Sequence, residues 1–565
     1  MSSSSNEKPG IGSRLCITGL AVFFAAFLFY PLLYVFRKAF IVDGAFSLEF
    51  FRLLLENETL RESLGNSLAI ACWVTLLASA AGFAFAALVV KTDLPLKGPI
   101  GNLLLMPVIL PPFVGAIGVK YIFGRFGMVN LLLIRLGMAD RLNPVDWLGQ
   151  PFWGVVLLEA LHLFPIMYLN IVGSYAMIDP TLEEAAQGLG ARGSTLFRTV
   201  TMPLLAPGFF AGASIVFIWA FTDLGTPLLF EYRTVAPVQI FNNVQAVQEN
   251  LLGYALVVVV LGITALFFVS AKFLFGRRRY EMPAFGRTSG ALVRLPRPVK
   301  AAALAFSGAF ILLAVTPHIS VLMVSLSKDW FMTVLPAEWT LEYYGKSFTH
   351  PAAFTSIRNS LAYSGLAMAA VLGLGGTTAY ILARKKFRGR EALDACAMLP
   401  LAAPGVVLAF GYVQGFFGTG LDPRVNPVPL LVISYAVRRL PLVVRALYAG
   451  FMQSSVTLEE ASASLGAGPA ATMKNITLPI IKANLLGAAI LAFAFSMLEV
   501  SDSLILAMQE RFYPMTKEIY MLMGRLGDGG YIASAMGVLG LVILAGALAL
   551  AQKLIGKRLG DLFRA

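Results

Sequence analysis

Long apolar segments alternate with short polar segments along the whole chain. Because about 20 apolar residues cross a bilayer as a helix, this pattern predicts twelve membrane-spanning helices. The first six are expected at Ile17–Phe36, Leu64–Val90, Ile100–Phe123, Phe152–Met177, Gly208–Leu229 and Leu251–Phe275. The other six are expected at Ala301–Leu326, Ser360–Ala383, Ala392–Phe417, Pro429–Gly450, Leu485–Met508 and Ile532–Leu554. The expected fold class is an all-α membrane protein.

The composition agrees with this interpretation. Hydrophobic residues make up 58% of the 565 residues and charged residues only 13%, whereas a soluble domain has roughly 45–50% and about 25%. The three cysteines, Cys16, Cys72 and Cys396, lie in apolar segments without the spacing of metal ligands. Neither a disulfide framework nor a zinc site is therefore predicted.

The positive charge of the chain predicts its orientation in the membrane. The formal net charge is +13, but Lys and Arg cluster at the ends of apolar segments and form no single basic face, which favours positive-inside topology over nucleic-acid binding. The segment 276–300 carries seven basic residues and one acid, and the loop 384–391 is also strongly basic. We therefore expect a multi-pass protein of the plasma (inner) membrane with these segments and both termini in the cytoplasm.

A polar segment occurs twice in the chain. Thr181–Pro203 (TLEEAAQGLGARGSTLFRTVTMP) returns as Thr457–Pro479 (TLEEASASLGAGPAATMKNITLP) at an offset of 276 residues. We call these the first and second repeated segments. Six predicted spans separate them, so both face the same compartment, and the halves are expected to be parallel repeats related by an axis along the membrane normal.

The repeat extends over most of the chain. Asn66–Ala69 matches Asn359–Ala362 at an offset of 293. The later fall in the offset from 293 to 276 means that the first half carries 17 additional residues, which we expect around Gly124–Gln150 on the non-cytoplasmic side. We assign residues 1–275 to a first unit, 276–300 to a basic cytoplasmic linker and 301–565 to a second unit.

Each repeated segment is predicted to form a short helix, a glycine turn and a second helical piece. A threonine followed three residues later by glutamate is the capping-box signature of a helix start, and the glycine is expected to end the helix. The residues of this pattern are Thr181, Glu184 and Gly190 in the first segment, and Thr457, Glu460 and Gly466 in the second.

The repeated segments resemble the Glu-Ala-Ala loop of permease subunits in binding-protein-dependent ATP-binding-cassette importers of the type I fold. The matching residues are Glu183, Glu184, Ala185, Ala186, Gly190 and Pro203 in the first segment, and Glu459, Glu460, Ala461, Gly466 and Pro479 in the second. Ser462 replaces the second alanine in the second segment. The resemblance covers nearly the whole chain as two fused permease units.

This resemblance implies a function and a set of partners. Each loop would form a coupling helix that docks on a separate ATP-hydrolysing subunit, so two such ATPase subunits, an extracytoplasmic solute-binding protein and membrane lipids are the expected partners. The fusion of two units is similar to the iron(III)-transport permeases, which makes iron(III) the leading substrate. Thiamine, phosphonate or polyamine import by the same mechanism, and an ion-gradient-driven secondary transporter, are the alternatives.

The chain shows no sign of being an enzyme. An ATPase needs a glycine-rich loop that ends in Gly-Lys-Ser/Thr and holds the phosphates, and the richest glycine run, 373–378, lacks the lysine and lies in an apolar segment. We therefore expect no cofactor and no metal site in this chain, with ATP and magnesium held by the partner subunit.

Charged residues within predicted spans are candidates for a substrate path, because burying a charge in the membrane is costly. The acids Asp223 and Glu499 correspond at the offset of 276, and Asp502 lies one turn further on. His162 and Arg438 also correspond, and Arg439 is adjacent. Two interpretations of the acids remain open at this point: they line a shared path, or they are hydrated structural residues near the outer end of the span. The basic groups either form ion pairs with the acids or contact an anionic or chelated substrate.

Overall fold

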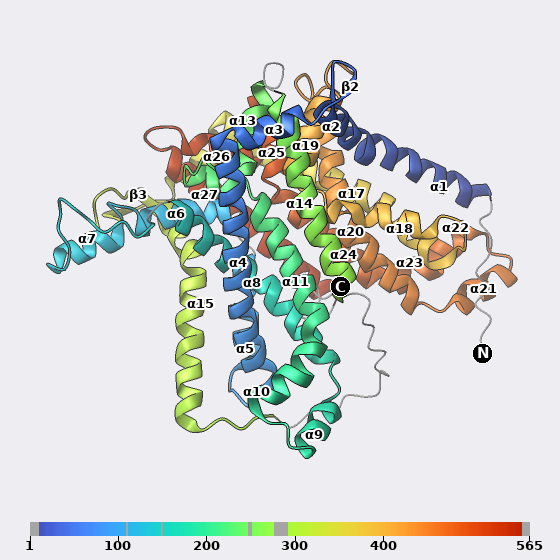
Figure 1. Cartoon of the computed structure of the whole chain (residues 1–565), viewed down its shortest axis with the longest axis horizontal. Coiled ribbons are helices and arrows are strands. Elements are labelled where there is room, and N and C mark those ends of the chain that lie inside the picture. The colour runs from blue at the N-terminus through green and yellow to red at the C-terminus, as the bar shows by residue number, and fades with distance from the viewer. Residues whose placement is uncertain (1–10, 109–110, 149–150, 247–250, 276–291, 556–565) are drawn as a thin grey trace.

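The computed structural model describes residues 11–108, 111–148, 151–246, 251–275 and 292–555. It is mostly helical, with two short β-hairpins (Figure 1). Before the linker the elements are α1 (Ile11–Phe24), η1 (Ala25–Phe29), α2 (Tyr30–Phe40), β1 (Ile41–Val42), β2 (Ala45–Phe46), α3 (Glu49–Glu56), α4 (Glu58–Lys91), α5 (Lys97–Leu103), η2 (Met106–Val108), α6 (Pro112–Phe123), α7 (Met128–Arg135), α8 (Pro151–Met177), α9 (Pro180–Gly188), α10 (Gly193–Leu196), η3 (Phe197–Thr201), α11 (Met202–Thr222), α12 (Gly225–Leu229), α13 (Ala236–Ala246) and α14 (Leu252–Phe275).

The second half repeats much of this order. Its elements are α15 (Arg297–Leu326), β3 (Ser327–Asp329), β4 (Glu338–Trp339), α16 (Glu342–Thr349), α17 (Pro351–Arg384), α18 (Arg390–Met398), η4 (Leu399–Leu401), α19 (Gly405–Gly415), α20 (Val428–Gln453), α21 (Val456–Ser464), α22 (Pro469–Thr472), η5 (Met473–Thr477), α23 (Leu478–Ile480), α24 (Lys482–Met497), α25 (Ser501–Leu506), η6 (Glu510–Phe512), α26 (Met515–Met523) and α27 (Gly529–Ile555). The strands pair antiparallel, β1 with β2 and β3 with β4.

Within the described residues, nine helices are long and apolar enough to cross a membrane, or up to eleven if each of two bent pairs counts as one span. The bent pairs are Arg390–Leu401 with Gly405–Gly415, at 101°, and Pro469–Ile480 with Lys482–Met497, at 78°. The predicted span Pro429–Gly450 corresponds to α20, which has the length but carries three arginines. An all-α membrane fold is thus confirmed.

The predicted continuous spans Ile100–Phe123 and Ala392–Phe417 are wrong, because each is a broken helix. The first is divided into α5, η2 and α6, and the second into α18, η4 and α19. The breaks fall at Pro107 and Pro111 in one half, and at the matching Pro400 and Pro404 in the other. Proline lacks the amide hydrogen and collides with the preceding turn of a helix, so two prolines four residues apart interrupt each span.

The same packing occurs in both halves. α4, α8 and α11 pack on one another, as do α17, α20 and α24. The first helix of each half also packs on the other half, with α15 against α6 and α2 against α19. A Cβ atom on Gly118 of α6 would lie 2.1 Å from Ser320 Oγ of α15, and one on Gly411 of α19 would lie 3.1 Å from Pro31 Cβ of α2. The helices approach closely at both crossings, and at Gly118 a larger residue would force a shift of the backbone.

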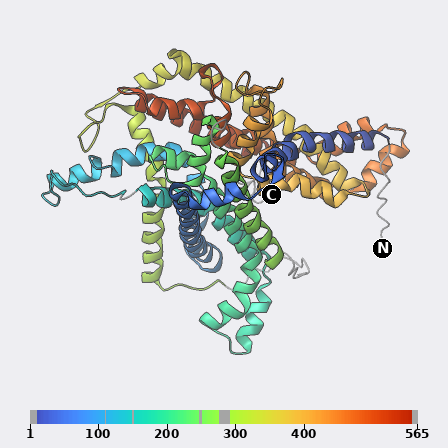
Figure 2. The same cartoon turned by 45° about the horizontal axis from the view of Figure 1, so that its top comes forward.

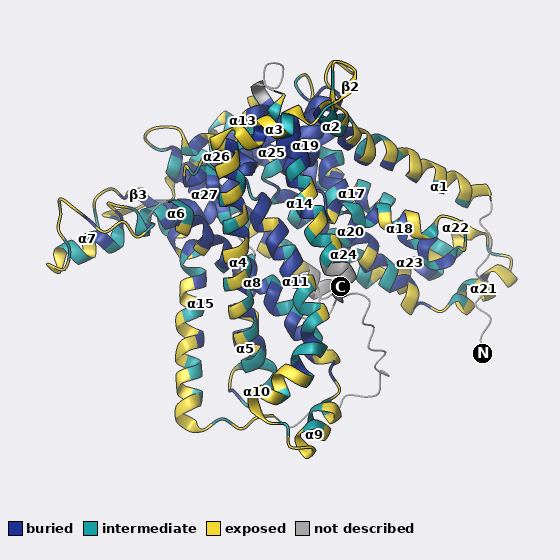
Figure 3. Ribbon diagram, in the orientation of Figure 1, coloured by how far each residue is buried: buried dark blue, intermediate teal, exposed yellow. Residues whose placement is uncertain are grey.

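Buried residues concentrate where the two halves meet, whereas the two repeated segments lie at separate ends of the molecule (Figures 2 and 3). The additional residues of the first half form α7 and the loop after it. This loop is organised by buried Asn130, which donates to the carbonyls of Arg125 and Val145 at 3.0 and 2.6 Å. Most of the predicted linker, 276–291, lies outside the described residues.

Candidate functional site

Each repeated segment begins with a short helix whose first turn is capped by a side chain. Asp179 accepts a hydrogen bond from the Thr181 amide at 2.9 Å, and Ser455 accepts one from the Thr457 amide at 3.3 Å. The capping box predicted with Thr181 and Thr457 as the caps is therefore wrong, since each helix starts about two residues earlier. Asp and Ser are strong N-cap residues, and Pro180 is well suited to the first helical position.

The predicted glycine ends of these helices are confirmed. Gly190 and Gly466 have φ angles of 92° and 85°, a left-handed conformation that glycine adopts at little cost. The residue before each glycine is a leucine with an almost fully exposed side chain, Leu189 at 91% and Leu465 at 89%. Both segments thus present an exposed leucine at the tip of the turn.

The first glutamate of each segment points back into the chain. The Lys91 side chain, at the end of α4, forms an ion pair with Glu183, and the Thr201 hydroxyl donates to Glu183 at 2.8 Å. In the second half Arg384, at the end of α17, donates twice to Glu459 at 3.0 and 3.2 Å. These two groups, which we call the segment anchors, tie each segment to its neighbouring long helix.

The sequence analysis did not identify the basic members of the anchors. The signal was present, because Lys91 and Arg384 correspond at the offset of 293, and Thr201 and Thr477 correspond at the offset of 276. The Thr477 hydroxyl donates to Glu459 at 3.3 Å. Both anchors are therefore built from the same three positions, Lys91/Arg384, Glu183/Glu459 and Thr201/Thr477.

The other predicted residues of the segments lie mostly on the surface. The exposed residues are Glu184, Ala185, Glu460, Ala461 and Pro479, and the half-buried ones are Ala186 and Pro203. Each segment thus has an inner glutamate held by an anchor and a second glutamate, one position on, that faces outward. The exposed leucine lies at the end of the same short helix.

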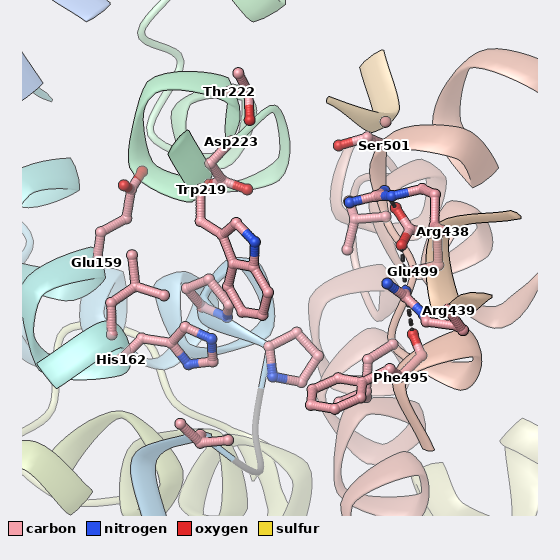
Figure 4. Close-up of a pocket in the computed structure, with 17 residues that line it drawn as sticks. Glu159, His162, Trp219, Thr222, Asp223, Arg438, Arg439, Phe495, Glu499 and Ser501 are labelled. Carbon is pink, nitrogen blue, oxygen red and sulfur yellow. Dashed lines mark hydrogen bonds and ion pairs between the residues drawn. The ribbon is translucent and has the colours of Figure 1, made fainter. Parts of the chain in front are cut away.

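The second candidate region is a cavity of about 160 Å³ between the two halves, which we call the interface cavity (Figure 4). Five of the six predicted substrate-path residues line it: His162, Asp223, Arg438, Arg439 and Glu499. The sixth, Asp502, is fully buried and lies 3.7 Å from Arg438. The structure therefore brings together residues from α8, α11, α20 and the break between α24 and α25.

The acids lie at helix breaks in both halves. Asp223 follows α11 and precedes α12, and its carboxylate accepts from the Thr226 amide at 3.0 Å. Glu499 lies between α24 and α25. The predicted single spans through Asp223 and Glu499 are therefore interrupted, and interrupted membrane helices commonly line ligand sites.

The basic residues of the second half form internal ion pairs. Arg438 and Arg439 both pair with Glu499, which is 6% exposed. The Ser434 hydroxyl donates to Asp502 at 2.8 Å. Of the two interpretations left open for Arg438 and Arg439, the structure supports ion pairing with the acids.

The first half differs from this arrangement. A His162 ring nitrogen, Nδ1, lies 2.9 Å from the Pro107 carbonyl, and the buried Glu159 also lines the cavity. Glu159 was not among the residues predicted from the sequence, although an acid within the predicted span Phe152–Met177 meets the same criterion as Asp223.

Comparison with known proteins identifies the family. The model of the binding-protein-dependent transport system inner membrane component matches the chain twice, at residues 77–280 and 372–560. The chain belongs to this family. It is thus a multi-pass permease component of the inner membrane.

Two relatives in this family match the chain over most of its length. A protein of Haemophilus influenzae that is named as a ferric transport system permease is 29% identical over 504 residues, which cover 87% of this chain and 77% of the relative. The ferric transport system permease protein FbpB of Actinobacillus pleuropneumoniae is 28% identical over 554 residues, which cover 94% and 76%. A chain of a bacterial alginate importer of known structure is 17% identical, with a TM-score of 0.36 over 48% of this chain and 99% of that chain.

Proposed function

We propose that this permease forms the membrane channel of an ATP-driven importer that moves iron(III) from a solute-binding protein into the cytoplasm. The observation that carries the proposal is the pair of repeated segments. Each presents an outward glutamate and an exposed leucine on a short helix, and each is fixed to a long helix by an anchor. In this proposal, the anchor passes the movement of a docked subunit to the long helix behind the segment.

The proposal includes a division of the chain and its orientation. Two parallel units of six spans, 1–275 and 301–565, are joined by the cytoplasmic linker, and both termini are in the cytoplasm. ATP hydrolysis takes place on two separate subunits that dock on the repeated segments. Closure of these subunits moves the helix groups of the two halves as rigid bodies about the interface cavity.

Iron(III) is proposed as the substrate because the two relatives that cover most of the chain are named as ferric transport permeases. The charges of the interface cavity are compatible with a cation, since three carboxylates, those of Glu159, Asp223 and Glu499, line it with two arginines. Thiamine, a phosphonate or a polyamine would use the same mechanism with a different binding protein.

Co-purification and reconstitution test the proposed function. The chain is expressed with its ATPase subunit and binding protein, purified in mild detergent and placed in liposomes. We expect two ATPase subunits per chain and uptake of radioactive iron(III) that requires internal ATP. Uptake by the chain alone, driven by an ion gradient, would refute the proposal, and uptake of only another solute would refute the choice of iron(III).

A further inference from the structure

Two acids of the first half, Glu159 and Asp223, line the interface cavity. Glu159 of α8 is 1% exposed, and neither of its carboxylate oxygens has a hydrogen-bond partner within the described part of the chain. Figure 4 shows Glu159 and Asp223 across the cavity from Arg438, Arg439 and Glu499.

The two walls of the cavity differ in charge balance. On the wall of the second half, Glu499 pairs with two arginines. On the wall of the first half, no lysine or arginine among the described residues forms an ion pair with Glu159 or Asp223. The acids of the second half are therefore paired with arginines, whereas Glu159 and Asp223 have no lysine or arginine partner within the described residues.

Corresponding positions show how this difference arises. At the offset of 276, Glu159 corresponds to Tyr435, whose hydroxyl lies 2.6 Å from Ser503 Oγ. His162 corresponds to Arg438, and an arginine also replaces the next residue. The second half thus lacks the buried acid of the first half and carries arginines that the first half does not have.

A buried acid without a hydrogen-bond partner in a membrane protein is costly, which makes it a candidate for binding a ligand. We infer that Glu159 and Asp223 form a transit site for a hard, multivalent cation, held by their carboxylate oxygens as it crosses the interface cavity. Hard cations prefer oxygen ligands of this kind. The cavity of about 160 Å³ has room for the ion with several of its waters, each of which occupies about 30 Å³ in the liquid. The inference rests on the proposed function, which supplies the cation.

Terbium(III) is a suitable probe because it is a hard trivalent ion that emits light when a nearby tryptophan is excited. Trp219 lines the same cavity. The full-length chain in detergent should show saturable, tryptophan-sensitised terbium emission, and Glu159→Gln should weaken the affinity at least tenfold. Glu159→Asp, which keeps the charge, should bind nearly as well as the wild type. Trp219→Phe should lower the emission without removing the bound terbium, measured by elemental analysis.

Glu231→Gln is the matched control, because Glu231 is an exposed acid outside the cavity that pairs with Lys120 at 3.0 Å. This variant should bind terbium like the wild type. The Gln substitution of Glu159 is nearly isosteric, so we expect the variant to fold, and size-exclusion chromatography checks this. A folded Glu159→Gln/Asp223→Asn double variant with wild-type terbium affinity would overturn the inference.

Transport measurements separate this inference from the proposed function. In liposomes with both partners, Glu159→Gln should lower iron(III) uptake at least tenfold while ATP hydrolysis stimulated by the binding protein stays within about twofold of the wild type. Wild-type uptake in this variant would refute the transit site. If the wild-type complex takes up no iron(III), the proposed function fails, and the terbium titration still decides whether the cation site exists.

Discussion

The two anchors should differ in strength, although they occupy corresponding positions. The Arg384 side chain is 7% exposed, and its Glu459 partner is 17% exposed. The guanidinium also donates to the Ser454 carbonyl at 3.1 Å. The Lys91 side chain is 31% exposed, and its partner, Glu183, retains a 2.8 Å hydrogen bond from a threonine.

The cost of removing each basic residue follows from this burial. Arg384→Met leaves a mostly buried carboxylate whose remaining bond, from Thr477, is 3.3 Å long, and breaking a buried pair in this way costs about 3 kcal/mol. Lys91→Met also leaves a mostly buried carboxylate, since Glu183 is 14% exposed. This carboxylate keeps the 2.8 Å bond from Thr201, however, and the lysine removed is 31% exposed, so we expect a smaller cost of about 1 kcal/mol. About 1.4 kcal/mol corresponds to a tenfold change in an equilibrium constant. The equilibrium constant for local opening should therefore rise about a hundredfold for the second segment and about fivefold for the first.

Hydrogen exchange followed by mass spectrometry measures both effects in one experiment. Arg384→Met should accelerate exchange in α21 and leave α9 unchanged, and Lys91→Met should do the reverse with a smaller effect. Adding Glu459→Gln to Arg384→Met should restore part of the protection, because no buried charge is then left unpaired. Equal acceleration by the two single variants, or no recovery in the double variant, would refute the argument.

Reversing the charge of both outward glutamates, as Glu184→Lys with Glu460→Lys, should abolish ATP-driven uptake while the chain stays in the membrane, since the docking faces then carry the wrong charge; unchanged uptake in vesicles would remove these residues from the coupling role. Gly118→Ala should lower the thermal unfolding temperature by a few degrees, because its methyl group would lie 2.1 Å from a serine hydroxyl of α15, whereas Gly262→Ala, with nothing within 4 Å, should not. The hydrogen bond from a lysine of α15 lowers the pKa of Asp93 below its ordinary value of 3.8, so this contact is complete above about pH 4 and is lost as the pH falls below it. The residues after α4 form a β-bridge with the linker, between Thr92 and Val293. Asp93→Asn should therefore speed amide exchange at this bridge already at pH 7. Unchanged exchange there would show that the contact has no structural effect.

The apolar pattern predicted the membrane fold because a helix of about 20 consecutive apolar residues matches the thickness of the hydrocarbon core of a bilayer. It did not predict the broken helices, because hydropathy averages over a window and so does not register the effect of Pro107 and Pro111 on the backbone. The helix starts were misplaced for a similar reason. Thr181 fits a capping box, but Asp179 and Pro180 form a better start two residues earlier.

The candidate sites were predicted in part. The duplication located the repeated segments and four residues of the interface cavity, because residues at a matched offset are expected at equivalent places in the two halves. The fifth, Arg439, is the neighbour of Arg438. It did not reveal the anchors, since the offset changes from 293 to 276 between Arg384 and Glu459 and the partners are 75 residues apart. Glu159 was missed because its counterpart in the other half is Tyr435, so the search for matched acids passed over it.

The central claim is that the two repeated segments dock on ATPase subunits, and cysteine cross-linking tests it most directly. Leu189→Cys and Leu465→Cys are introduced separately into a chain whose three native cysteines are replaced by serine, and the complex with its ATPase is oxidised. Leu142→Cys, equally exposed at 89% in the loop after α7, is the control. The account predicts that both repeated-segment cysteines form a disulfide with a cysteine placed in the docking cleft of the ATPase, and that the control does not. If neither cysteine cross-links while the complex remains active, the segments are not the docking surface and the account is contradicted.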